Sequence, residues 1–346
     1  MAEANTPSLA DAVPAADQIL YMSYVNFLIF RAVYMVTKLG IPDLLKDGPL
    51  KSDELAEATG SHSRTLYRLL RAVSSAGVLS ESQDHAFSLT PLGDVLRSDA
   101  PGSMRGLVIF SGEPFYLQVF EQFAYSIQTG KPAFDKVLGA SHFDYFEQNP
   151  EIGEVFDQCM TDWSYNEAVA VTKAYDFSCY QTVMDVGGGH GILLTNILKA
   201  NPHIRGMLFE QPHVLEGARS RMETEGLLPR CELVAGDFFN SIPSGSDVYI
   251  MKSILHDWED EPSIAILKSC RQAMGDSGRL LLVETIVPPP GESHYAKYMD
   301  LEMLVLLGGQ ERTLEEFEAL FAQADLRLSR VVPTEEFHSI IETVSA

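Results

Sequence analysis

The sequence predicts an α/β protein in which a Rossmann-like doubly wound domain follows an N-terminal all-helical, winged-helix domain. Three observations support this fold class. Strand and helix patterns alternate from Gln181 onward, as a parallel sheet with crossover helices requires. A glycine-rich turn joins an apolar strand to a helix within residues 183–193. The first hundred residues combine helical periodicity with a single hairpin pattern.

Composition narrows the functional classes. The 346 residues are enough for two domains, and no apolar run approaches the roughly 20 residues of a membrane span. Residues 1–16 lack the basic start of a signal peptide, so we expect a cytoplasmic protein without a membrane partner. The four cysteines show no C-x-x-C spacing, which fits reduced thiols and argues against zinc. The net charge of −23 disfavours nucleic acid and favours a cationic ligand.

The first elements along the chain form a winged-helix pattern. Ile19–Gly40 has nearly helical spacing of apolar residues and ends at a glycine. Two shorter helices are expected at 52–60 and 61–77, followed by a hairpin made of 78–80 and 86–90. A winged helix can bind DNA through its second helix. Because basic residues are few here, a dimerisation scaffold is the better interpretation, and we expect a homodimer.

The rest of the chain divides into a helical region and a sheet domain. Aromatic residues are dense between Pro101 and Tyr175; most should be core, and some can line an apolar pocket for a flat ligand. We therefore expect a dimerisation domain at 1–100, a helical linker and substrate-pocket region at 101–178, and a catalytic domain at 179–346. The predicted strands are Thr182–Val186, Arg205–Phe209, Cys231–Ala235, Asp247–Lys252, Arg279–Glu284 and Arg327–Pro333.

The glycine turn is the most informative motif. The strand Val183–Val186 leads into Gly187-Gly-Gly-His-Gly191, and a second short strand ends at Glu210. Such a turn brings backbone close to a nucleoside whose ribose hydroxyls the acid can receive. The spacing is G-x-G-x-G instead of the G-x-G-x-x-G of a pyrophosphate-binding turn, which favours S-adenosylmethionine over a nicotinamide cofactor. The alternative is a tight β–α turn without a ligand.

Several motifs in order give the chain a family resemblance. It resembles the S-adenosylmethionine-dependent O-methyltransferases of the caffeate, isoflavone and acetylserotonin type, whose bacterial relatives methylate aromatic natural products. The likeness covers nearly all of the chain after about residue 20 and implies a homodimer with a small aromatic hydroxyl substrate. The motifs are Thr129–Phe134, Phe156–Met160, Val183–Gly191, Phe209–Val214, Gly236–Phe239, Met251–Trp258 and Gly308–Thr313.

The resemblance implies a set of cofactor-binding residues. Gly187 matches the turn glycine beside the methionine moiety, and Glu210 matches the ribose-binding acid. Many members have aspartate at the second position, but glutamate can accept the same two hydroxyl protons. Asp237 and Phe238 match the pair that contacts adenine, a carboxylate for the exocyclic amine and an apolar side chain for the ring.

Three more positions follow from the same motifs. Lys252 matches the family lysine after the fourth strand, acting through its backbone. Met160 and Ser164 align with residues that approach the cofactor from the helical side. For Met160, as for Phe238, the alternative is plain core packing.

The chemistry requires a base. Methyl transfer from a sulfonium needs a nucleophile held against the methyl group, and a phenol of pKa about 10 is a weak nucleophile until its proton is removed. Histidine, with an ordinary pKa of about 6.5, suits this task. His256 lies just beyond the fourth strand and matches the family base.

A base histidine needs a partner on its other ring nitrogen. Glu284 closes the fifth strand and Glu311 matches the second family carboxylate, so either is a candidate. Asp257 contacts substrate or caps the next helix. No cluster of histidine and acids has metal spacing, so we expect no metal, unlike the smaller catechol-type enzymes that use magnesium.

Three alternatives remain at this point. The first is a methyltransferase-fold enzyme that works by proximity alone, or is diverted to another reaction and lacks a general base. The second is a nicotinamide-dependent oxidoreductase, which the glycine spacing disfavours. The third is a non-catalytic DNA-binding regulator, which would need a basic face. The sequence does not identify the acceptor or the hydroxyl that is methylated.

Overall fold

The computed structural model describes residues 14–346, and within them the chain forms two compact units. One unit ends at Pro114 and the other runs from Phe115 to Ala346. The α/β fold class is confirmed, with a helical first unit and a large mixed sheet in the second. Residues 1–13, part of the stretch examined for a signal peptide, lie outside the described residues. The three-part division at residues 100 and 178 stays a prediction.

The first unit contains the winged-helix arrangement. The helices α4 and α5 precede the β2–β3 hairpin, and β1 adds a third antiparallel strand in the order β1-β3-β2. Leu66, Leu70 and Val73 form the buried stripe of α5. The elements are α1 Ala15–Leu20, the π-helix η2 Tyr21–Val25, α2 Asn26–Lys38, α3 Ile41–Leu44, β1 Leu50–Lys51, α4 Ser52–Thr59, α5 Ser63–Ser75, β2 Leu79–Glu81, β3 Ala86–Leu89, α6 Pro91–Asp94 and α7 Arg105–Gly112.

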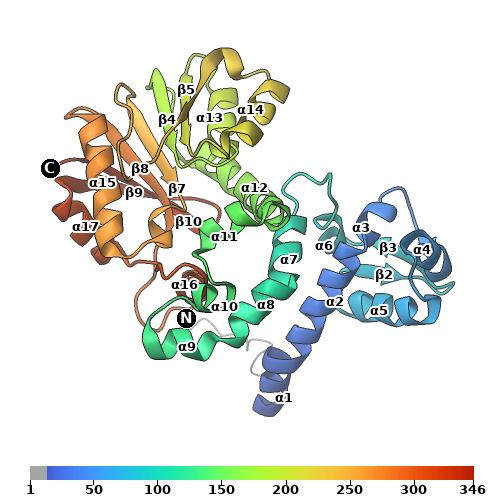
Figure 1. The fold of residues 1–346 in the computed structure, drawn as a ribbon. Coiled ribbons are helices and arrows are strands. Elements are labelled where there is room, and N and C mark those ends of the chain that lie inside the picture. Colours follow the sequence, from blue (N-terminus) through green and yellow to red (C-terminus); the bar gives the residue numbers. More distant parts are fainter. Residues whose placement is uncertain (1–13) are drawn as a thin grey trace, which may run out of the picture. The chain divides into compact units, whose positions relative to one another are not determined.

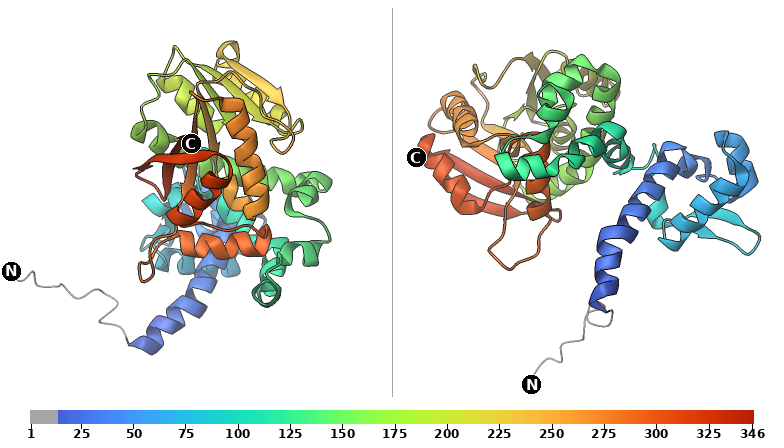
Figure 2. Two further views of the ribbon diagram at one scale, coloured as in Figure 1. Left: turned by 90° about the vertical axis from the view of Figure 1, so that its left-hand side faces the viewer. Right: turned by 60° about the horizontal axis from the view of Figure 1, so that its bottom comes forward.

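The first helix is unusually apolar on its exposed surface. Figure 2 shows α1, η2 and α2 as one continuous helical rod. By length and composition the helix Ala15–Lys38, with a mean hydropathy of 1.5, could cross a membrane, so the expectation that no apolar run is long enough is wrong. Polar residues such as Ser23 and Asn26 interrupt the apolar run in the sequence, but they do not lower the mean hydropathy of the helix enough to exclude a membrane span. Length and composition alone do not distinguish a span from a helix that packs against another protein surface. The large exposed side chains are Ile19, Leu20, Tyr21, Met22, Tyr24, Phe27, Leu28 and Met35.

The second unit is built on a seven-stranded sheet in the order β6-β5-β4-β7-β8-β10-β9. The five strands from β6 to β8 are parallel, and β10 is antiparallel to both of its neighbours. The six predicted strands are present, with ends that differ by at most one residue. The strand β10, His338–Ser345, is a correction because no strand was predicted there.

The remaining helices and strands belong to this second unit, except that α8 begins at Pro114, the last residue of the first unit. They are α8 Pro114–Glu121, α9 Phe123–Thr129, α10 Ala133–Leu138, α11 His142–Gln148, α12 Pro150–Ala174, β4 Thr182–Val186, α13 Ile192–Ala200, β5 Arg205–Glu210, α14 Leu215–Thr224, η3 Leu228–Arg230, β6 Cys231–Ala235, β7 Val248–Lys252, η4 Leu255–Asp257, α15 Asp260–Met274, β8 Arg279–Thr285, α16 Ala296–Leu306, α17 Leu314–Gln323, β9 Leu326–Pro333 and β10 His338–Ser345.

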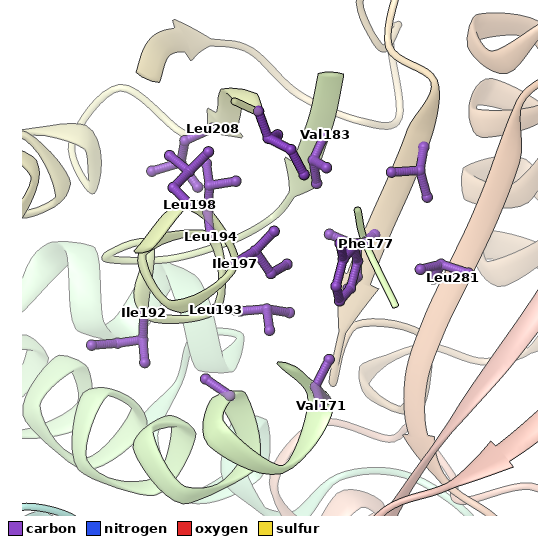
Figure 3. Packing of buried hydrophobic residues seen from close by; sticks show 14 of the residues in the cluster. Val171, Phe177, Val183, Ile192, Leu193, Leu194, Ile197, Leu198, Leu208 and Leu281 are labelled. Atoms are coloured by element: carbon purple, nitrogen blue, oxygen red, sulfur yellow. The ribbon is translucent and has the colours of Figure 1, made fainter. Parts of the chain in front are cut away.

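Two apolar layers hold this sheet between helices. In β4, Val183 joins the cluster on one face and the next residue, Met184, joins the cluster on the other, because side chains alternate along a strand. The helices α12, α13 and α14 cover the first face, and α15 and α17 cover the second (Figure 1). Figure 3 shows Ile197 and Phe177 packed in the first layer. Burial on both faces explains the nearly continuous apolar runs of the central strands.

The strand order places a ligand-binding edge near the middle of the sheet. The chain passes from β4 to β5 and β6 in one direction, and then returns to build β7 and β8 on the other side of β4. Open α/β sheets bind ligands outside the carboxyl ends of the strands at such a switch point. The glycine turn follows β4 and the segment of His256 follows β7, so both lie at this edge.

Candidate active site

The glycine turn after β4 is compact and leaves no room for a side chain at Gly187, Gly188 or Gly191. Gly187, Gly189 and Gly191 all have positive φ, which favours glycine. A Cβ atom on Gly188 would lie 2.4 Å from Leu208 and 2.6 Å from a carboxylate oxygen of Asp185. The backbone therefore lies directly against the sheet edge, where a ligand can approach it closely.

Glu210 is bound to this turn. Its Oε2 accepts the N–H of Gly189 at 2.9 Å, and its Oε1 accepts the N–H of Gln211 at 2.7 Å. Burial raises the pKa of the Glu210 carboxyl, against the effect of these two backbone donors. Each carboxylate oxygen has a second lone pair, so the fixed carboxylate can still receive two hydroxyl groups.

Asp237 and Phe238 follow β6 at the same edge. Asp237 accepts the N–H of Phe239 at 2.9 Å and the amide of Asn240 at 3.0 Å, which fixes its carboxylate in a tight turn. A Cβ atom on Gly187 would lie 3.6 Å from the ring of Phe238. The structure thus brings Phe238 next to the glycine turn, while its contact with adenine stays a prediction.

Trp258 belongs to the same aromatic group but was not among the predicted site residues. Its ring centroid lies 4.8 Å from that of Phe239 and 6.4 Å from that of Phe238, both edge-on. On its other side it stacks on Phe143 of α11 at 6.2 Å. The signal that could have identified it is its place in the motif Met251–Trp258, two residues after His256.

The long helix α12 is tied to the glycine turn through His190. The Nδ1 of His190 lies 3.2 Å from the hydroxyl of Thr161, and its Nε2 lies 3.9 Å from Asp157. Met160 is 40% exposed and shares a helix face with Ser164, one turn further along α12. Both predicted residues therefore lie on the helix that faces the turn.

Lys252 ends β7 with its ammonium group already paired. Its Nζ donates to Glu167 of α12 at 2.9 Å, and His338 approaches the other oxygen of Glu167 at 2.9 Å. Burial alone would raise the pKa of Glu167, but Lys252 and His338 lower it to about 2. This pairing engages the side chain of Lys252 with α12 and leaves its backbone as the part that can face a ligand; its role toward the cofactor stays a prediction.

The turn that carries His256 is held by Glu284. Ser253 has a φ of 53°, a left-handed conformation that is uncommon for a residue with a side chain. The next two backbone N–H groups, those of Ile254 and Leu255, both donate to Oε1 of Glu284 at 3.0 and 2.9 Å. The buried carboxylate at the end of β8 thus fixes the backbone from which the histidine projects.

His256 has one engaged and one available ring nitrogen. Its Nδ1 lies 2.8 Å from Oε1 of Glu311, whereas Oε2 of Glu284 is 4.0 Å away, too far for a hydrogen bond. Its Nε2 makes no hydrogen bond to any described residue, and Oδ1 of Asp257 lies 3.4 Å from it. Of the two predicted partners, the geometry therefore favours Glu311 for the ring and Glu284 for the backbone.

The motif Gly308–Thr313 wraps around the same turn. A Cβ atom on Gly309 would lie 2.0 Å from the carbonyl oxygen of His256, which also accepts the N–H of Gln310 at 2.9 Å. Arg312, 1% exposed, donates to the carbonyls of Leu255 at 2.9 Å and Trp258 at 2.8 Å. Arg312 is a positioning residue that sequence reasoning missed, although it lies beside Glu311 in a recognised motif.

Three carboxylates set the protonation of His256. Burial lowers the pKa of the imidazole, but Asp257, Glu311 and Glu284 together raise it to about 10. Burial raises the pKa of Asp257 to about 7 and also raises that of Glu284, whereas the hydrogen bond and charge of His256 outweigh burial and lower that of Glu311. The three carboxylates therefore make His256 a stronger base than an isolated buried imidazole.

The same cluster has a metal-like geometry. One donor atom each from His256, Glu284 and Glu311 lie within 4.8 Å of one another. The expectation that no cluster of histidine and acids has metal-like spacing is therefore wrong. The cluster was missed because its three residues come from separate segments, so their spacing in the sequence does not reveal it. The donors are one imidazole nitrogen and two carboxylates, which is a set that divalent cations accept.

Comparison with known proteins identifies the family. Residues 120–327 match the O-methyltransferase domain, and residues 22–99 match the O-methyltransferase dimerisation domain. The chain belongs to the S-adenosylmethionine-dependent O-methyltransferases. The family assignment does not support the nicotinamide-dependent alternative.

Relatives of this O-methyltransferase include bacterial biosynthetic enzymes. It is 44% identical to the phenazine O-methyltransferase PhzM of Lysobacter antibioticus over 96% of this chain and 97% of that one, and the crystal structure of LaPhzM has a TM-score of 0.92 at 43% identity over 96% and 100%. It is 39% identical to the mitomycin biosynthesis 6-O-methyltransferase of Streptomyces lavendulae over 88% and 87%. The O-methyltransferase NcsB1 from neocarzinostatin biosynthesis, solved with S-adenosylmethionine and 2-hydroxy-5-methyl naphthoic acid, has a TM-score of 0.76 at 31% identity over 91% and 95%.

The residues at the glycine turn fit S-adenosylmethionine, the cofactor of this family. Asp185 lies under the turn with both carboxylate oxygens buried and without a hydrogen bond in the described chain, and burial raises its pKa to about 7. Glu210 retains acceptor capacity for ribose hydroxyls, and Phe238 and Trp258 supply apolar faces for a flat base. A set of acids around a backbone turn suits a cationic nucleoside.

Proposed function

We propose that the enzyme transfers the methyl group of S-adenosylmethionine to a phenolic oxygen of a small aromatic acceptor, with His256 as proton acceptor and without a metal. The observation that carries this proposal is the arrangement at His256. Glu311 occupies Nδ1 at 2.8 Å, while Nε2 makes no hydrogen bond within the described residues. A ring held by one nitrogen and open at the other is the arrangement of a positioned general base.

The residues around the glycine turn would hold the cofactor. Gly187 and its neighbours would lie against the methionine part, Glu210 would receive the ribose hydroxyls, and Asp237 with Phe238 would contact adenine. On the opposite side, α12 would contribute Met160 and Ser164, and Lys252 would contribute its backbone. When bound, the cofactor supplies a methyl group on a positively charged sulfur.

The raised pKa of His256 is compatible with its role as a base. A phenolate beside an imidazolium and a phenol beside a neutral imidazole contain the same number of protons. Because the pKa of His256 is raised to about 10 and that of a phenol is about 10, this one proton can lie on the oxygen or on Nε2 with little difference in free energy. A pair that starts as a phenol beside an imidazolium holds one proton more, and it must release that proton to solvent before the transfer. His256 therefore moves the proton off the oxygen as the oxygen becomes a nucleophile. Glu311 and Asp257 stabilise the imidazolium that results.

Asp257 has a place in this scheme beside Nε2. Its Oδ1 lies 3.4 Å from that nitrogen, on the side of the ring open to the acceptor. We propose that Asp257 strengthens the base through its charge, in addition to any contact with the acceptor hydroxyl. This charge effect develops as the pH rises through about 7, where its carboxyl ionises.

Metal independence is supported by the directions of the hydrogen bonds. An ion bound between the three residues would replace the hydrogen bond between Nδ1 of His256 and Glu311. It would also need Oε1 or Oε2 of Glu284 as a ligand, and Oε1 already accepts two backbone N–H groups. It would also lie on the side of the ring away from Nε2. The test is turnover after exhaustive treatment with EDTA and after addition of Mg²⁺ or Zn²⁺. We expect rates within about twofold of the untreated enzyme, and loss of activity restored by one metal would refute this part.

We also propose that the enzyme is a cytoplasmic homodimer that binds neither nucleic acid nor membranes and methylates aromatic natural products. The support is the dimerisation domain at residues 22–99 and the exposed apolar side chains of α1 to α2, which need a covering surface. The net charge of −23 opposes binding to nucleic acid and anionic membranes.

The function is tested with labelled S-adenosylmethionine and a panel of phenols, naphthols, hydroxyquinones, hydroxyindoles and phenazinols. We expect transfer of label to a hydroxyl oxygen of at least one aromatic class. Parallel calorimetry with S-adenosylmethionine and with NAD distinguishes the cofactors. Binding of NAD alone, or labelling confined to non-aromatic acceptors, would contradict the proposal.

A further inference from the structure

Glu302 and Tyr116 form a polar pair with no role in the proton transfer described above. Tyr116, on α8, donates its hydroxyl to Oε1 of Glu302, on α16, at 2.8 Å. Oε2 of Glu302 accepts no hydrogen bond from any residue that the structure describes. A partly buried carboxylate with one oxygen fixed and the other unused is available to a ligand.

The helix faces around Glu302 are lined by large and mostly apolar side chains. Met299 and Glu302 lie one turn apart on one face of α16, and Tyr295, the residue that precedes the helix, continues this spacing. The ring of Tyr295 lies 5.9 Å from that of Trp163 on α12, and its hydroxyl lies 3.9 Å from the sulfur of Met299. Glu302 is therefore a charged group on a face that otherwise suits a flat aromatic molecule.

Electrostatic effects connect this face to His256. Burial raises the pKa of Glu302, while the hydrogen bond from Tyr116 and the charge of His256 lower it. Burial raises the pKa of Tyr295, and the nearby carboxylates of Glu302 and Glu311 add to the increase. Tyr295 thus lies within range of both Glu302 and the partner of His256.

We propose that Glu302 determines acceptor specificity: it receives a hydrogen bond from a second donor on the acceptor ring, an amino N–H or a hydroxyl, and disfavours acceptors that carry a carboxylate at that position. This inference rests on the proposed function. A site that binds a donor group discriminates against analogues without it, because its buried acceptor is then left unpaired. A carboxylate at the same place would bring two like charges together. The expected preference differs from the naphthoic acid with which NcsB1 was solved.

The experiment compares acceptors on one scaffold: naphthol, a series of aminonaphthols with the amine at different ring positions, and the corresponding hydroxynaphthoic acids. The measured quantity is the ratio of kcat/KM values within one enzyme preparation, which does not depend on the active fraction. We expect the parent enzyme to prefer the best aminonaphthol over naphthol by about 10–100-fold, the range for a hydrogen bond to a charged group.

Three variants test the assignment to Glu302. In Glu302→Leu the preference should fall to about one. In Glu302→Gln the kcat/KM of the hydroxynaphthoic acids should rise by about tenfold relative to that of naphthol, because the like charge is removed. A purely structural role of Glu302 would not change this ratio. Tyr298→Phe, on the same helix but 68% exposed, is the matched control and should keep the parent ratios. Parent-like ratios in both Glu302 variants would overturn the inference while leaving the proposed function intact.

Binding gives a second readout that does not require turnover. In calorimetry with saturating S-adenosylhomocysteine, the best aminonaphthol should bind the parent about 10–100-fold more tightly than it binds Glu302→Leu. Equal affinities would overturn the inference even if methylation occurs. If this difference is present but no naphthol is methylated, the role of Glu302 is supported and the proposed function is contradicted.

Discussion

Replacing Glu311 by glutamine removes the negative charge nearest to Nδ1 of His256 while keeping an oxygen that can accept the same hydrogen bond. The Oε1–Nδ1 distance is 2.8 Å, and both side chains are largely buried. A hydrogen bond to a charged partner contributes about 1.5–3 kcal/mol, and about 1.36 kcal/mol corresponds to one pKa unit. The variant should therefore lower the pKa of His256 from about 10 to about 8–9.

The assay is an NMR titration of histidine-labelled protein between pH 5 and 11. The chain has nine histidines, so the resonance of His256 is assigned from its loss in His256→Asn. Glu318→Gln, which removes an exposed carboxylate from α17, is the control and should leave the titration unchanged. A parent His256 that titrates near 6.5, or a Glu311→Gln variant that titrates like the parent, would refute the reasoning about the carboxylate cluster.

Three further predictions concern the cofactor, stability and assembly. Glu210→Ala should weaken S-adenosylmethionine binding by about 1.5–3 kcal/mol in calorimetry, and Asp237→Ala by less; parent-like binding by both would place the cofactor elsewhere. Because the pKa of folded His256 is near 10, above its ordinary 6.5, its contribution to stability is complete below pH 6.5 and is lost as pH rises through 10. Denaturant titrations at pH 7 and 10 should therefore show a larger loss of unfolding free energy for the parent than for His256→Asn, and equal losses would contradict the raised pKa. Light scattering at micromolar concentration should show a dimer, and deletion of residues 1–100 should give insoluble protein. A monomeric full-length chain would contradict the assignment of the dimer interface to α1 and α2.

The sequence patterns predicted the sheet well because its strands are buried on both faces. Residues such as Val183 and Leu281 belong to short apolar runs bounded by turns, which leave little ambiguity. The last strand was missed because the run that starts at His338 has polar and apolar residues in pairs (His-Ser, Ile-Ile, Glu-Thr), which matches neither an alternating strand nor a continuous apolar run. The strand β10 follows its partner β9 directly in the chain, but only the antiparallel pairing of β10 with β8 makes β10 part of the core.

The motifs predicted which residues to expect at the site, but they did not predict the contacts between those residues. The motifs place His256 after β7, Glu284 near the end of β8 and Glu311 between α16 and α17, but the separation of these residues in sequence conceals that they form one cluster. Spacing alone does not reveal which acid would contact the ring, because this depends on the left-handed turn at Ser253. Arg312 was missed for a similar reason, since its hydrogen bonds go to carbonyls that only the folded turn brings together.

General-base catalysis requires that Nε2 of His256 accepts the proton of the acceptor hydroxyl. The most direct measurement is kcat for the parent and His256→Ala across a series of phenols of increasing acidity at pH 7. On a phenol of pKa about 10 the variant should be slower by about 10²–10⁴-fold, and this difference should shrink toward one as the phenol becomes acidic enough to ionise without a base. Affinity for S-adenosylmethionine should change little. A variant that keeps most of its activity on the neutral phenol, or a deficit that stays constant across the series, would contradict general-base catalysis by His256.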